Sequence, residues 1–174
     1  MEKILVSACL LGKPVRYDGS DKTVASSILS QWQREGRVVG LCPEVEAGLP
    51  VPRPPAEIIG GRGGDAVHDG TAKILENTGK DVTQSFLAGA WKALETARKW
   101  HCRFALLTDG SPSCGSSFLY DGSFTGARIP GAGVVAALLL KNGVEVFSEH
   151  QISMLAERLD ADETPFRTGC LRRF

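Results

Sequence analysis

Three short apolar runs in this chain are each followed closely by a cysteine. Residues 4–8 precede Cys9, residues 38–41 precede Cys42, and residues 104–107 precede the loop that carries Cys114. Apolar runs without polar alternation are typical of parallel strands that are buried on both faces. The carboxyl ends of such strands open onto one crevice, where ligands bind. We therefore expect the three thiols to meet there and to hold a metal or cluster with one position left open.

The order of apolar and polar segments predicts a Rossmann-like α/β fold, with a mostly parallel sheet flanked by helices and a small irregular or β insertion. The length of 174 residues suits a single α/β catalytic domain over residues 1–160, followed by a tail over 161–174. The spacing of hydrophobic residues and the helix-capping residues predict where the strands and helices lie. Strands are expected at 3–8, 37–41, 104–108 and 144–147, helices at 24–35, 81–100, 134–141 and 148–159, short hairpins at 57–73 and 118–124, and a proline-rich irregular stretch at 43–55.

Charge and hydropathy exclude several classes of protein. Twenty basic and twenty acidic residues give a net charge of zero, so bulk nucleic acid is not an expected partner. No apolar stretch reaches the roughly 18–20 residues that span a bilayer, and the N-terminus lacks the pattern of a secretory signal. We expect a cytoplasmic protein without membrane partners, whose five cysteines stay reduced.

A buried cysteine is often only a small apolar side chain, and we assign that role to Cys102 and Cys170. The other three thiols have residues beside them that let the chain turn tightly: Gly12, Pro43 and Gly115. Soft thiolates bind iron–sulfur clusters or zinc, and a catalytic zinc with three protein ligands is a possible alternative. Three histidines could replace a thiolate, although none lies in a cysteine loop: His68, His101 and His150.

Two polar residues stand next to the proposed ligands. Glu44 follows Cys42 by two positions and is a candidate general base or acid, and Ser113 precedes Cys114 and is a candidate proton relay. Ordinary turn hydrogen bonds would also explain both. Asp109 and Ser111 are weaker candidates of the same kind, because turn hydrogen bonds explain them as well. Candidates to line the pocket, which surface turns and salt bridges explain equally well, are Arg16, Tyr17, Arg53, Tyr120 and Asp121.

The glycine pattern at residues 131–136 partly matches a dinucleotide-binding fingerprint. It does not clearly follow a strand, and it comes near the end of the fold. We interpret it as close helix packing, or as a helix N-terminus that is offered to an anion.

Six segments together resemble the thiouracil desulfurase family, long catalogued as a domain of unknown function. They are residues 6–12 (VSACLLG), 16–19 (RYDG), 42–44 (CPE), 52–57 (PRPPAE), 111–115 (SPSCG) and 120–126 (YDGSFTG). The resemblance covers residues 4–150 and implies a 4Fe–4S cluster on Cys9, Cys42 and Cys114, with one iron lacking a protein ligand. It implies sulfur removal from a thiolated pyrimidine, with Glu44 as the catalytic acidic residue and Ser113 as the catalytic serine.

Such an open iron would act as a Lewis acid toward a thiocarbonyl, while Glu44 activates water, so that no external electron is needed. Three other hypotheses stay open: a zinc-dependent hydrolase, a non-catalytic iron–sulfur or sulfur carrier, and a redox thiol enzyme. The natural substrate is also open among 2- or 4-thiouracil, its nucleoside or nucleotide, and thiolated transfer RNA.

Overall fold

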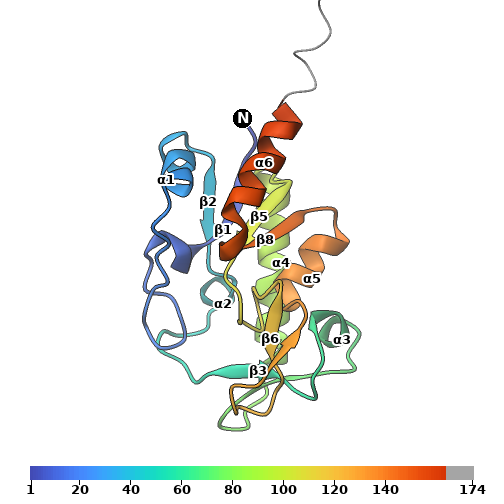
Figure 1. Ribbon diagram of the computed structural model, residues 1–174. Coiled ribbons are helices and arrows are strands. Elements are labelled where there is room, and N and C mark those ends of the chain that lie inside the picture. Colours follow the sequence, from blue (N-terminus) through green and yellow to red (C-terminus); the bar gives the residue numbers. More distant parts are fainter. Residues whose placement is uncertain (164–174) are drawn as a thin grey trace, which may run out of the picture.

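The computed structural model describes residues 1–163, and its central feature is a four-stranded parallel sheet in the order β2-β1-β5-β8 (Figure 1). Its strands are β1 (Ile4–Ser7), β2 (Val38–Leu41), β5 (Phe104–Leu107) and β8 (Glu145–Ser148). Every neighbouring pair in this sheet is parallel. The expected α/β fold with a mostly parallel sheet is confirmed.

Helices cover both faces of the sheet (Figure 1). They are α1 (Ser27–Arg34) and α6 (Ile152–Glu163) on one face, and α4 (Thr83–Lys99) and α5 (Val134–Lys141) on the other. Successive strand side chains point to opposite faces. Ile4 and Val6 pack with α1 and α6, whereas Leu5 lies in the cluster that α4 and α5 form. The helices therefore cover the two faces of the sheet and leave the carboxyl ends of the strands uncovered.

Two small antiparallel sheets lie beyond that edge, in the lower part of Figure 1. The first pairs β3 (Ala56–Ile58) with β4 (Ile74–Glu76), and the second pairs β6 (Phe118–Tyr120) with β7 (Arg128–Pro130). They are the predicted β insertion. The second hairpin is wider than expected, because Tyr120 pairs with Arg128 instead of turning at Asp121 and Gly122.

Two further expectations were wrong. The proline-rich stretch begins with a helical turn, α2 (Pro43–Glu46). Proline is tolerated at the first position of a helix, because the backbone N–H that it lacks would not form a helical hydrogen bond there. The short hairpin expected at 57–73 contains a helix instead of tight turns alone, since its glycine-rich segment at 60–64 leads into α3 (Gly64–His68). A Cβ on Gly64 would lie 2.5 Å from the Gly133 carbonyl, so glycine is required for α3 to approach α5.

The start of α5 packs directly on the loop of Cys114. The N–H groups of Val134 and Val135 donate to the carbonyls of Pro112 and Ser113, each at 2.9 Å. A Cβ on Gly133 would lie 2.5 Å from both carbonyl oxygens. The glycine pattern therefore serves close packing, and these N–H groups are not available to an anion.

The last helix extends past the boundary expected at residue 160, since α6 continues to Glu163. The rest of the predicted tail, with Cys170, lies outside the described residues. Within residues 1–163, no helix is both long and apolar enough to cross a bilayer.

Candidate active site

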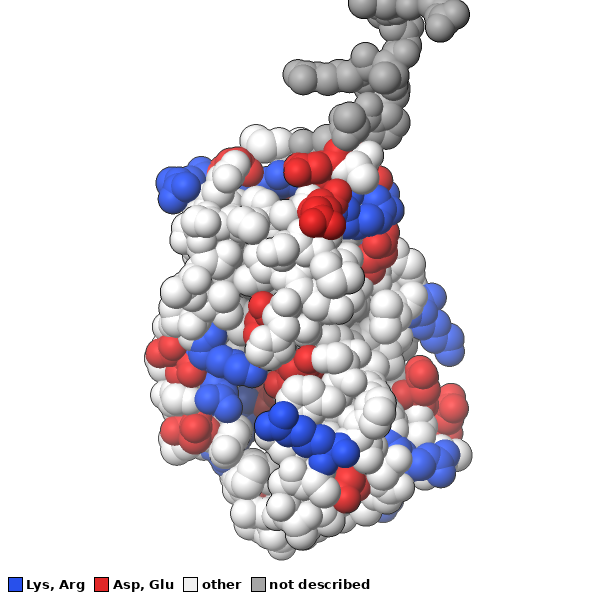
Figure 2. All heavy atoms as spheres, in the orientation of Figure 1, with Lys and Arg blue, Asp and Glu red and all other residues white. Residues whose placement is uncertain are grey.

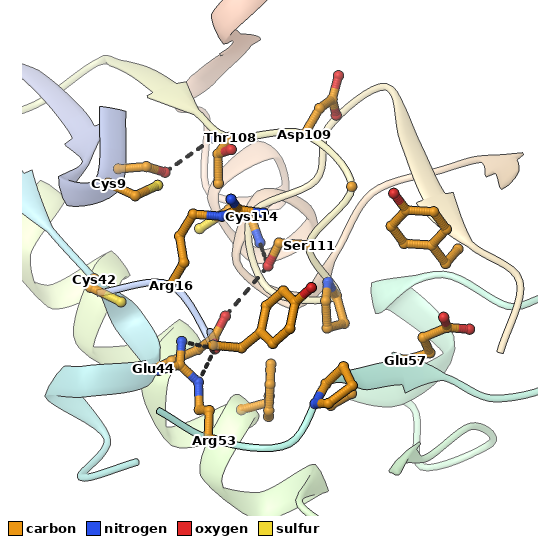
Figure 3. Close-up of a pocket in the computed structure, with 18 of the residues that line it drawn as sticks. Cys9, Arg16, Cys42, Glu44, Arg53, Glu57, Thr108, Asp109, Ser111 and Cys114 are labelled. Carbon is orange, nitrogen blue, oxygen red and sulfur yellow. Dashed lines mark hydrogen bonds and ion pairs between the residues drawn. The ribbon is translucent and has the colours of Figure 1, made fainter. Parts of the chain in front are cut away.

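A cavity of about 610 Å³ opens at the carboxyl ends of the parallel strands, and all three candidate thiols line it (Figure 3). Cys9 lies in the 3₁₀ turn η1 (Ala8–Leu11), directly after β1. Cys42 lies between β2 and α2, and Cys114 lies in the loop after β5. Residues that are far apart in sequence thus meet because three adjacent parallel strands end at one edge.

Burial and mutual repulsion make these thiols hard to ionise. Burial, followed by the charge of Cys42, raises the pKa of Cys9 to about 11. The pKa of Cys114 is raised by burial and then by Cys9, Glu44 and Cys42, and burial also raises the pKa of Cys42. Free thiols in this state are poor nucleophiles, which disfavours the redox thiol hypothesis. A bound cationic centre would offset the repulsion among three thiolates.

Each sulfur has hydrogen-bond donors that favour its thiolate form, and those of Cys42 are the backbone groups of Val45 and Glu44. The Thr108 hydroxyl bonds to Cys9 and the Ser7 hydroxyl bonds to Cys114. These donors are held together, because the Thr108 N–H donates to Ser7 Oγ at 3.1 Å. Metal-bound thiolates are commonly supported by such donors, so this donor set fits an iron–sulfur cluster. Within residues 1–163, no group of three or more Cys, His, Asp or Glu side chains is placed to hold a single metal ion.

Glu44 faces the same cavity from the first turn of α2 and is held firmly by Arg53. Arg53 Nε donates to Glu44 Oε2 at 2.7 Å, and the Arg53 NH2 group also pairs with this oxygen. Arg53 is anchored in turn by the carbonyls of Val15 and Pro50, at 3.1 Å each. Because Arg53 engages Oε2, the other carboxylate oxygen is the one left for a ligand or a water.

The serine near Glu44 is Ser111 rather than Ser113. Ser111 lines the cavity, and its hydroxyl lies 3.4 Å from Glu44 Oε1 (Figure 3). Its oxygen also accepts the N–H groups of Ser113 and Cys114, at 3.1 and 3.3 Å. Ser113 is 1% exposed and is not among the lining residues, and its hydroxyl has no hydrogen-bond partner within residues 1–163. The sequence favoured Ser113 because it is adjacent to a proposed ligand, whereas the turn directs Ser111 into the cavity.

Residues 4–151 match the family model described as 2-thiouracil desulfurase. This chain belongs to the 2-thiouracil desulfurase family. The resemblance expected from the six segments is thereby confirmed. A solved structure of a [4Fe-4S]-dependent thiouracil desulfidase, TudS, is 47% identical, with a TM-score of 0.84 over 92% of this chain and 99% of that one. A Bacillus subtilis (strain 168) protein, the uncharacterized YbbK, is 45% identical over 86% of this chain and 97% of its own length.

In this desulfurase the two small sheets form the other side of the cavity. Figure 3 places Glu57, from β3, across the space from Cys9 and Cys42. The lining residues on this side are mainly aromatic or charged: Glu57, Glu76, Phe118, Tyr120, Phe124 and Arg128. The Arg128 guanidinium lies 4.5 Å from the centre of the Phe118 ring, a cation–π distance. Figure 2 shows basic side chains gathered around the hollowed middle of one face, with acidic atoms between them.

Sequence reasoning identified four lining side chains in advance, namely Arg16, Tyr17, Arg53 and Tyr120, whereas Asp121 is not among the lining residues. It missed Lys22, Glu57 and Arg128, since none stands next to a cysteine. It also missed Glu149, which pairs with Lys22 and accepts the Asp109 N–H at 2.8 Å. Only the packing of distant loops brings these residues together.

Proposed function

We propose that this protein exchanges the sulfur of a thiolated pyrimidine for oxygen in the cavity described above, with a 4Fe–4S cluster held by Cys9, Cys42 and Cys114. Three thiolates leave one iron of such a cluster without a protein ligand. The single observation that carries this proposal is that three thiols, each located after a different strand, line one cavity together with a fixed carboxylate. As a member of its family, the chain is an iron–sulfur-dependent thiouracil desulfurase.

When bound, the cluster supplies a Lewis-acidic iron with a preference for the soft thiocarbonyl sulfur. Glu44 accepts a proton from the water that attacks the carbon bearing sulfur, acting as a general base. Arg53 keeps the carboxylate in place, since it holds Oε2 while Oε1 faces Ser111. The fixed orientation saves the entropy of positioning the base at the moment of reaction.

Ser111 is the better candidate for the second proton transfer. Its hydroxyl lies 3.4 Å from Glu44 Oε1, so it can pass a proton between the carboxylate and a ring nitrogen of the substrate. The Ser113 hydroxyl lacks access to the cavity and contributes no step. The overall reaction consumes one water, breaks a carbon–sulfur double bond, forms a carbon–oxygen double bond and releases hydrogen sulfide. It balances without any electron donor or acceptor.

The decisive experiment is anaerobic cluster reconstitution, followed by a sulfide-release assay. Substrates are 2-thiouracil, 4-thiouracil, their nucleosides and nucleotides, and thiolated transfer RNA. We expect many turnovers with at least one small thiopyrimidine. Sulfide that stops after one equivalent would indicate a sulfur carrier, and activity in a colourless, zinc-loaded sample would indicate the hydrolase.

The Glu44→Gln variant tests the base in the same assay. Glutamine keeps the size and one oxygen of the side chain but cannot accept the proton, so we expect an intact cluster spectrum and a loss of kcat of about 10²- to 10⁴-fold. Full turnover by this variant, with the cluster in place, would remove Glu44 from the mechanism.

A further inference from the structure

The loop between β6 and β7 holds an aromatic side chain in an unusual backbone conformation beside the cavity. Phe124 has φ 58°, in the left-handed region that bulky residues avoid. It lines the cavity and is 36% exposed, so packing in the core does not account for the conformation. Strained residues that the surrounding structure holds in place often lie at ligand sites.

Several contacts fix this loop. Glu57 Oε2 accepts the N–H groups of Gly122 and Phe124, at 2.9 and 3.1 Å, and Glu57 is itself 9% exposed. Gly122 packs so closely that an added Cβ would lie 2.5 Å from the Ile58 carbonyl oxygen. The N–H of Gly61 donates to the carbonyl of Asp121 at 2.9 Å. Phe124 is therefore presented by a well-anchored loop and not by a free one.

Its position is defined by Glu57. Because Phe124 bonds through its N–H to Glu57, it belongs to the side of the cavity that faces Cys9 and Cys42 (Figure 3). A substrate whose sulfur lies toward the thiols extends its remaining ring atoms toward this side. An aromatic ring offers a planar, sequence-tolerant stacking or edge contact to a pyrimidine.

We infer that Phe124 is a specificity-determining residue of the desulfurase, which contacts the part of the substrate ring away from the sulfur, and that Glu57 is the positioning residue for it. This inference rests on the proposed function, since it assumes that a thiopyrimidine enters the cavity. The contact is present before and during the reaction, so it contributes to binding rather than to the chemical step. The strained backbone at Phe124 destabilises the fold locally, and it is retained because it directs the ring toward the cavity.

The test compares Phe124→Gly, Phe124→Ala and Phe124→Tyr in the cluster-loaded protein. Removal of the ring should raise KM for the thiopyrimidine and Kd for uracil at least about fivefold, while kcat changes by less than about twofold. Phe124→Tyr keeps the ring and should restore parental KM. Uracil has no sulfur, so its binding by calorimetry reports the contact without turnover.

Stability provides the second measurement. Glycine adopts φ 58° without strain, so Phe124→Gly should unfold at a higher temperature than Phe124→Ala, the reverse of the usual order. His101 is a matched control, because it has φ 54° but does not line the cavity. His101→Gly should likewise be more stable than His101→Ala, with KM unchanged.

Unchanged KM and uracil affinity in Phe124→Gly would overturn the inference, provided that the parent enzyme releases sulfide. If Phe124→Ala were more stable than Phe124→Gly, the strained backbone conformation on which the inference rests would be contradicted. A parent protein that binds a cluster but releases no sulfide from any thiopyrimidine would instead refute the proposed function.

Discussion

The two sides of the cavity are built in opposite ways. The thiol side comes from the ends of three parallel strands, and Cys9 and Cys114 are almost completely buried there, at 5% and 4% exposed. The hairpin side comes from two short antiparallel sheets and presents the accessible Phe124. The comparison teaches that the thiols are buried within the main fold, whereas the side to which we assign substrate recognition belongs to short hairpins that share the same core through Ile58, Ile74 and Leu119.

The largest effect should follow from removal of one ligand on the thiol side. Cys42→Ala is expected to abolish both the visible absorbance of the reconstituted cluster and sulfide release, because two thiolates cannot hold the cluster in an open cavity. Circular dichroism should show that the fold persists, since Cys42 is only partly buried.

Cys102→Ala is the matched control for this variant. Cys102 is buried in the apolar core and does not line the cavity. The variant should keep the cluster and the activity, with a loss of about 1 kcal/mol in the free energy of unfolding from poorer packing. A colourless Cys102→Ala protein, or a fully active Cys42→Ala protein, would contradict the assignment of cluster binding to the thiol side of the cavity.

An intermediate effect should separate the two serines of the cysteine loop. Ser111→Ala removes the hydroxyl 3.4 Å from Glu44 Oε1, and we expect kcat to fall about tenfold, equivalent to ~1.4 kcal/mol. Ser113→Ala removes a buried hydroxyl that has no partner, so its kcat should stay within about twofold of the parent. The reverse order would restore the role that the family resemblance gave to Ser113.

The smallest effect on activity is expected at Asp109, in the loop that joins the two sides, where the change is one of stability. Burial acts to raise the pKa of Asp109, but hydrogen bonds from Ser117, Ser116 and Phe118 outweigh it and hold the pKa below its usual range. A lowered native pKa stabilises the fold above the unfolded value of about 3.9, and this stability is lost as the pH falls through the native pKa.

Asp109→Asn should therefore lower the free energy of unfolding by about 1.5–3 kcal/mol at neutral pH, since hydrogen bonds to a charged group are lost. Urea unfolding should show that this deficit narrows in acid, because only the parent has the Asp109 contribution to lose there. A deficit that is the same at about pH 7 and about pH 3 would contradict the assignment.

The parallel sheet could be predicted because its strands are apolar on both faces and its helices have clear periodicity and ends; α5 (Val134–Lys141) has the bounds expected from sequence. The short elements could not be, since proline and glycine content alone does not distinguish an irregular wall from α2 or α3. At the site, proximity to Cys42 in the sequence predicted that Glu44 lies near the thiols, and Glu44 does line the cavity. The same reasoning favoured Ser113, whereas the tight turn directs Ser111 into the cavity and leaves Ser113 buried behind it, so the catalytic serine stays a prediction to test.

Cys9, Cys42 and Cys114 belong to segments that only the finished sheet brings together. A peptide with any one of the three motifs would offer a single sulfur, unlike the compact cysteine repeats of small ferredoxins. On the proposed ligation, we therefore expect the polypeptide to acquire its tertiary structure before it can receive the cluster. A cluster on these three cysteines would link three remote stretches of chain, so we expect loss of iron in air to lower the unfolding temperature of the enzyme as well.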